Sequence, residues 1–105
     1  MIEIEESSGN VYSDLDIPNA DEMLVKAQLV KKIGEIIKDR SLTQREAADV
    51  LGITQPKLSM MLRGQFRGIS EVKMLECLAR LGRNIKIVVS HEQQSVGSVE
   101  VVFAN

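Results

Sequence analysis

The feature that most constrains the fold of this chain is a glycine between two short segments, each opened by a helix-capping residue. Thr43, followed three residues later by Glu46, forms a capping box, in which a hydroxyl and a carboxylate satisfy the first backbone N–H groups of a helix. Thr54 opens a second segment, and Pro56 falls in its first turn, where the missing N–H breaks no helical hydrogen bond. Gly52 supplies the positive φ of a tight turn. The sequence therefore predicts two short helices joined by a tight turn.

The apolar residues of this stretch follow the spacing of two packed helices. The positions expected inside are Ala48, Val50, Leu51, Leu58, Met61 and Leu62. Ala48 is expected where the helices cross, because a larger side chain there would push them apart. A generic helical hairpin does not need an alanine four residues before the glycine and an apolar residue six after it. The spacing is that of a helix-turn-helix motif.

Two further helices are predicted on either side of this motif. The first has Asn19 as its cap and runs to about Arg40, and Gly34 in its interior indicates that a neighbouring helix crosses closely there. Its apolar positions recur every three or four residues and are Met23, Ala27, Val30, Ile33, Ile36 and Ile37. The opposite side carries Lys26, Lys31, Lys32 and Lys38. The last helix begins at the cap Ser70 and ends at Gly82. Its residues expected to face inward are Val72, Leu75, Leu78 and Ala79.

After Gly82 the periodicity changes from 3.6 to 2, which is the period of a β-strand. Residues 84–89 are rich in isoleucine and valine and predict one strand. Residues 99–103 could form a second strand beyond a polar loop.

Composition excludes several classes of protein. The chain has 105 residues, of which 44% are hydrophobic and 27% charged, as expected for one small globular domain. No 18-residue apolar run is present, and the acidic first six residues do not resemble a signal peptide, so we expect a cytoplasmic protein without a membrane span. Cys77 and His91 are the only residues of their kinds. They offer no nucleophile–base pair and no metal-ligand set, so we expect no enzyme, no metal and no cofactor.

The charges are unevenly distributed along the chain. The net charge is −2, but residues 1–22 hold seven acidic and no basic residues, and the remainder holds 13 basic and eight acidic residues, or +5. Such asymmetry favours a mildly basic binding domain with an acidic arm. The alternative is that the acidic residues only keep a tail solvated.

The residues of the motif resemble those of a known family. Thr43, Gln44, Ala48, Gly52, Leu58, Ser59, Leu62, Arg63 and Gly64 resemble the helix-turn-helix signature of the Xre/Cro-repressor family. The match covers roughly residues 25–82, and the whole layout, with its acidic N-terminal extension, resembles HigA-type antitoxins. The resemblance implies that Gln44 contacts phosphate, that the second helix of the motif lies in the major groove, and that a ribonuclease toxin is a partner. Met60 and Met61 depart from the family, whose members often have a charged or polar side chain there.

The predicted fold class is therefore mainly α: a four- to five-helix repressor-like helix-turn-helix domain with a short C-terminal β-strand or hairpin. We divide the chain into an acidic N-terminal arm (1–18), a helix-turn-helix DNA-binding domain (19–83) and a C-terminal β segment (84–105).

Helical geometry supports the same site independently of the family. If Leu58, Met61 and Leu62 are buried, the residues on the opposite side and at the N-terminal end of their helix can reach base edges. Gln55 can pair with adenine, and Pro56 or Met60 can touch a thymine methyl group. The nearby cations Lys57, Arg63 and Arg67 would neutralise phosphates. The candidate DNA-binding residues are Gln44, Gln55, Pro56, Lys57, Ser59, Met60, Arg63 and Arg67.

Each assignment has an alternative. Gln44 and Gln55 could be ordinary first-turn residues, Met60 could be core filler, and Arg63 and Arg67 could be a solvated face. Cys77 is expected to be a small buried apolar residue, and His91 has no assigned role.

The predicted function is a sequence-specific repressor, the antitoxin of a toxin–antitoxin pair that represses its own operon and neutralises a ribonuclease toxin. A stand-alone phage-type regulator is the first alternative, and a module that binds only protein is the second. The partners expected are a double-stranded DNA operator, a second copy of the chain and the toxin. The C-terminal strand would pair either across the two-fold axis of a homodimer or with residues 99–103 of its own chain.

Overall fold

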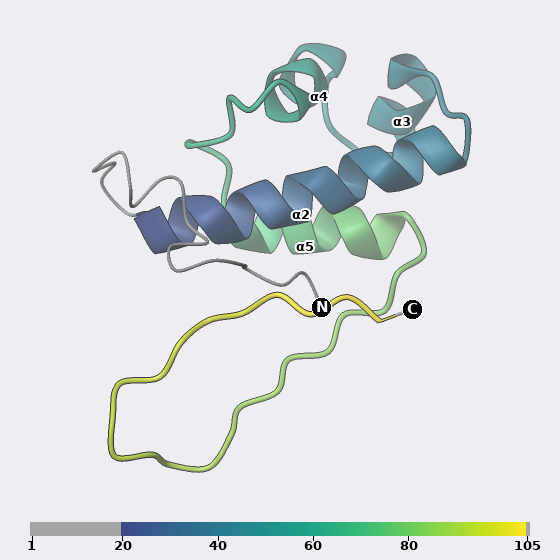
Figure 1. Ribbon diagram of the computed structural model, residues 1–105. Coiled ribbons are helices and arrows are strands. Elements are labelled where there is room, and N and C mark those ends of the chain that lie inside the picture. Colours follow the sequence, from purple (N-terminus) through teal and green to yellow (C-terminus); the bar gives the residue numbers. More distant parts are fainter. Residues whose placement is uncertain (1–19, 105) are drawn as a thin grey trace.

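Four helices make up the fold of residues 20–104, which are the residues that the computed structural model describes. They are α2 (Ala20–Asp39), α3 (Gln44–Leu51), α4 (Gln55–Leu62) and α5 (Glu71–Arg80). The long helix α2 packs along α5, while α3 and α4 lie together on one side of this pair (Figure 1). The acidic arm of residues 1–18 and the predicted cap Asn19 lie outside the described residues. None of the helices in the described part is long and apolar enough to cross a membrane.

The core lies where the four helices meet. Its fully buried large side chains are Ile33, Ile36, Leu51, Leu58, Met61, Met74 and Cys77. Ala48 is also buried, and Val50 and Leu62 are partly buried against the same cluster. The interior predicted for the two short helices is therefore confirmed. Burial raises the pKa of the Cys77 thiol, as expected for a cysteine that serves as a small apolar core residue.

The predicted tight turn between α3 and α4 is present. Gly52 has φ 70° and ψ 31°, in the left-handed region that glycine adopts without steric cost. The backbone N–H of Ile53 donates to the carbonyl of Ala48 at 3.1 Å, which closes the end of α3. Gly82 has φ 89° just after α5, where the N–H of Arg83 donates to the carbonyl of Leu78 at 3.1 Å. Both glycine helix ends are confirmed.

The buried face of α5 differs from the prediction. Val72 is 73% exposed and Ala79 is exposed, whereas Met74 and Cys77 are buried together with Leu78. Met74, Cys77, Leu78 and Leu81 form a stripe with the i, i+3, i+4, i+7 spacing of a helix face. Packing against α2 selects this stripe, and it leaves Val72 on the outside.

One expectation for α2 was wrong, and another was confirmed in part. Lys26 was placed on the solvent side but is only 4% exposed. Gly34 does lie beside α4, yet a Cβ atom added there would be 3.6 Å from the Leu62 side chain, an ordinary van der Waals contact. The neighbouring helix therefore does not require a glycine at this position.

The C-terminal β-strand or hairpin predicted in residues 84–105 is absent from the described residues. Residues 83–100 instead leave α5, form a wide loop and return toward α2 (Figure 1). Val101 packs against the core, and the ring of Phe103 lies 5.4 Å from Nζ of Lys32. A β-branched composition favours extended backbone, but a strand also needs a partner for its N–H and C=O groups. Within the described part of the chain, residues 84–89 have no such partner.

Candidate nucleic-acid interface

The first part of the interface is the N-terminus of α3. The hydroxyl of Thr43 accepts a hydrogen bond from the N–H of Glu46 at 3.1 Å, and the Glu46 carboxylate accepts one from the N–H of Thr43 at 2.9 Å. This is the predicted capping box. The bond from the Thr43 N–H, together with the Thr43 hydroxyl, lowers the pKa of Glu46. Gln44 is the first residue of α3, and its side chain is exposed beside a firmly capped helix end.

The second part is the outer face of α4. The Thr54 hydroxyl accepts from the N–H of Lys57 at 3.2 Å, and Leu58 and Met61 anchor the opposite face in the core. Met60 is 45% exposed, so it lies at the surface and does not fill the core. Ser59 was expected to point outward and is half-buried. The other predicted side chains of this segment are all exposed: Gln55, Pro56, Lys57 and Arg63.

The third part is the turn that connects α4 to α5. Phe66 and Ile69 are buried, and the N–H of Ile69 donates to the carbonyl of Phe66 at 3.0 Å. Arg67 lies between these two anchors with an exposed side chain. Its carbonyl accepts a hydrogen bond from Nζ of Lys26 at 2.8 Å. The backbone of Arg67 is thus held in place while its guanidinium remains available to solvent.

The charge of α4 and of the turn after it has one sign. Residues 50–70 include Lys57, Arg63 and Arg67 and no aspartate or glutamate. In the described part of the chain, the ion pairs involve other residues, on α2 and α5. Within residues 20–104, Lys57, Arg63 and Arg67 therefore form no ion pair with a carboxylate. Such a surface suits a polyanion, because each cation can neutralise a phosphate and release the counterion condensed on it.

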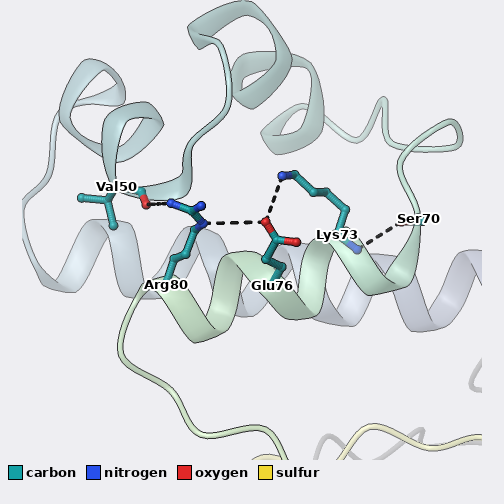
Figure 2. A network of polar contacts seen from close by, with 5 residues as sticks. All are labelled: Val50, Ser70, Lys73, Glu76 and Arg80. Carbon is teal, nitrogen blue, oxygen red and sulfur yellow. Dashed lines mark hydrogen bonds and ion pairs between the residues drawn. The ribbon is translucent and has the colours of Figure 1, made fainter.

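A polar network on α5 supports the turn between α3 and α4 (Figure 2). Nη1 of Arg80 lies 3.5 Å from the carbonyl oxygen of Val50, near the C-terminal end of α3. Glu76 orients this guanidinium through a 3.7 Å contact to its Nε and also accepts from Nζ of Lys73 at 3.2 Å. A Cβ atom added to Gly52 would lie only 3.1 Å from Nη1 of Arg80. The turn therefore needs glycine for its φ, whereas the guanidinium of Arg80, the end of a flexible and half-exposed side chain, would only have to shift slightly to make room for a Cβ atom.

Sequence reasoning missed two residues that support the interface, Lys26 and Arg80. Both carry charges on helices, a pattern that normally indicates a solvated face. Each contacts the backbone of a distant segment, 41 residues away for Lys26 and 30 for Arg80. The contacts depend on how the helices pack, and no local pattern in the sequence indicates them.

Comparisons with known proteins point in the same direction. A family model described as a helix-turn-helix domain matches residues 11–90. A solved structure described as a "Putative XRE Family Transcriptional Regulator" superimposes with a TM-score of 0.76 and 29% sequence identity. The superposition covers 83% of this chain and 100% of that one. No protein of curated function matches the chain.

Proposed function

Because the chain belongs to the helix-turn-helix family, we propose that it is a sequence-specific DNA-binding transcriptional repressor and not an enzyme. The observation that carries this proposal is an exposed surface without a carboxylate, on which Lys57 of α4 is followed by Arg63 at the end of the helix and by Arg67 in the next turn. The solved relative named as an XRE-family transcriptional regulator supports the same general function.

In the proposed complex α4 lies in the major groove, with its N-terminal residues toward the base edges. The amide of Gln55 is suited to the paired donor and acceptor of adenine, and Pro56 and Met60 to a thymine methyl group. Gln44 and the free N–H groups at the start of α3 bind phosphate, and so do Lys57, Arg63 and Arg67. Ser59, which is half-buried, contributes at most a hydroxyl at the edge of this surface.

We place the repressor in the cytoplasm as a homodimer. The C-terminal segment supports a dimer, because Ile87, Val88 and Val89 are exposed in an extended stretch without a ladder partner in the described residues. Pairing with a second copy would provide hydrogen-bond partners for that backbone and cover Ile87 and Val89, which lie on the same side of an extended stretch. It would also set two α4 helices about 34 Å apart, one turn of DNA.

The more specific proposal is that the protein is an antitoxin that represses its own operon and neutralises a ribonuclease toxin. A ribonuclease must bind the phosphates of RNA, so its active face is expected to be basic. Residues 1–22 carry −7, which would attract and block such a face. The stand-alone regulator is the second candidate, and a small basic open reading frame beside the gene distinguishes the antitoxin from it. Deletion of residues 1–18 then tests the role of the arm: the truncated chain should lose neutralisation of the toxin and keep operator binding.

DNA binding is tested by selecting duplexes from a random-sequence pool with the full chain. Gln55→Ala should weaken binding to the selected duplex by about 1–3 kcal/mol and relax the preference at one base position. Lys57→Ala should weaken binding to all DNA sequences alike and make the affinity less dependent on salt concentration. Failure of the wild-type chain to enrich any duplex would refute a sequence-specific repressor. An unchanged base preference in Gln55→Ala would show that α4 does not read bases as proposed.

A further inference from the structure

Lys26 of α2 is a buried cation joined to a distant turn. It is 4% exposed, although lysine is among the residues that are least often buried. Its Nζ lies 2.8 Å from the carbonyl oxygen of Arg67, 3.5 Å from a carboxylate oxygen of Glu22 and 4.0 Å from one of Glu71. The ammonium group thus connects the first turns of α2 and α5 with the turn that follows α4.

The shortest of these contacts shows what the ammonium group holds. The carbonyl of Arg67 is within good hydrogen-bonding distance, whereas the two carboxylates are at ion-pair distance only. Glu22 and Glu71 therefore balance the charge, while the directional bond goes to the backbone of the turn. Burying a charge is unfavourable unless it is paired and hydrogen-bonded, and both conditions are met here.

The turn held in this way presents Arg67. Phe66 and Ile69 fix its two ends in the core, and the bond from the Ile69 N–H to the Phe66 carbonyl closes it. Lys26 fixes the peptide between them from the inside, and the Arg67 side chain is exposed on the outside. A backbone fixed before binding loses less conformational entropy when its side chain meets a ligand.

We propose that Lys26 is a positioning residue for DNA binding: by holding the Arg67 carbonyl it orders the turn after α4 so that the Arg67 guanidinium meets a phosphate. This role rests on the proposed function. Lys26 itself touches no DNA, since its side chain is buried on the inner side of the turn.

The first test needs no DNA. Lys26→Met keeps most of the side-chain volume and removes the hydrogen bond, so amide exchange of Ile69 should become roughly tenfold faster. The matched control is Lys31→Met, the same change at an exposed position of the same helix, and it should leave Ile69 unchanged. The separate variant Lys26→Arg, whose guanidinium can donate to the same carbonyl, should retain the slow amide exchange of Ile69. Unchanged exchange in a folded Lys26→Met variant would overturn the proposal.

The second test uses a fluorescein-labelled duplex that the wild-type chain has enriched from a random-sequence pool. The slope of log affinity against log salt concentration is negative, and Arg67→Ala and Lys26→Met should each reduce its magnitude by about one, as for one lost phosphate contact. The double variant should also lose about one and not two, because both changes remove the same contact. A loss of about two would show that Lys26 and Arg67 act independently, and an unchanged slope in Lys26→Met would show that Lys26 contributes to stability alone. Either result would overturn the proposal.

A further variant is informative even if Lys26→Met does not fold. Glu71→Gln removes one carboxylate from Lys26 and leaves the bond to Arg67 in place. The slope should remain that of the wild type, and a decrease of one in its magnitude would overturn the assignment to the carbonyl contact. A wild-type chain that enriches no duplex would refute the proposed function itself. That result differs from one in which the chain binds DNA and the effects of the substitutions at Lys26 and Arg67 are additive.

Discussion

Two exposed regions of the molecule differ in whether their backbone N–H and C=O groups have hydrogen-bond partners. The outer face of α4 and the turn after it belong to a helix with a capped start, a buried opposite face and a turn anchored at Phe66, Ile69 and Lys26. Residues 84–100, here called the C-terminal loop, expose isoleucine and valine side chains on an extended backbone. The first region is polar and ordered by its own domain. The second has the composition of a strand but no ladder within the described residues, so its structure depends on what it pairs with.

The largest expected effect separates the two regions by stability. Leu58 is fully buried beneath the outer face of α4, so Leu58→Ala should lower the free energy of unfolding by about 2–5 kcal/mol through lost burial and a residual cavity. Val88→Ala in the C-terminal loop should change it by less than about 0.5 kcal/mol, because that side chain is exposed. Urea unfolding followed by circular dichroism measures both. A large effect of Val88→Ala would show that the loop is packed in solution.

The next prediction concerns self-association through the C-terminal loop. Changing both Ile87 and Val89, which are 78% and 88% exposed, to lysine should convert the proposed dimer to a monomer without loss of monomer stability. Operator affinity should fall by roughly a hundredfold, because one chain can no longer present two α4 helices. Sedimentation and fluorescence anisotropy measure the two effects. Gln93→Lys with Ser95→Lys adds the same charge to the same loop and should remain dimeric. If the first variant also remains dimeric, this segment is not the dimer contact.

A smaller effect is expected at the turn between α3 and α4. Gly52→Ala should lower the free energy of unfolding by about 1–2 kcal/mol, because alanine is strained in the left-handed conformation. The added Cβ atom should also displace the Arg80 guanidinium. Gly97→Ala in the C-terminal loop is the matched control, since an added Cβ atom meets nothing there. Thermal unfolding of both variants tests the contrast. Equal stability of the two would mean that the turn does not constrain the position of α4.

The smallest prediction concerns pH. Because the folded-state pKa of Glu46 is lowered, its capping box adds stability above its ordinary pKa of 4.5, and this contribution is lost as the pH falls through the lower folded value. Urea unfolding should therefore show wild type more stable than Glu46→Gln at pH 7, with a difference that shrinks as the pH falls below 4.5. Glu92→Gln in the C-terminal loop should leave stability unchanged at pH 7. A difference between wild type and Glu46→Gln that does not shrink below pH 4.5 would contradict this explanation.

The elements that the sequence predicted correctly depend on local chemistry. The caps Thr43 and Thr54 bond to the third residue after each of them, and Gly52 adopts its φ because of the turn that it occupies. The core positions Leu58 and Met61 follow from helical periodicity. With these fixed, most of the exposed face of α4 could be predicted, since it is the side opposite the core.

The errors concern residues whose environment is set by other segments. Val72 and Met74 are both apolar, and only packing against α2 decides which of them is buried. The half-buried position of Ser59 likewise depends on neighbouring elements. The prediction of a strand in residues 84–89 was wrong because β-propensity describes how residues fit a sheet and supplies no partner strand.

By itself, the sequence determined the two capped helices, the glycine turn between them and the cation-only charge of residues 50–70, because hydrogen bonds, φ angles and charges of this kind are set within a few residues. Only the tertiary structure decided that Lys26 is buried under the turn after α4 and that Arg80 approaches the backbone near Gly52. These contacts join segments 41 and 30 residues apart, and they form only once α2 and α5 have packed beside the motif.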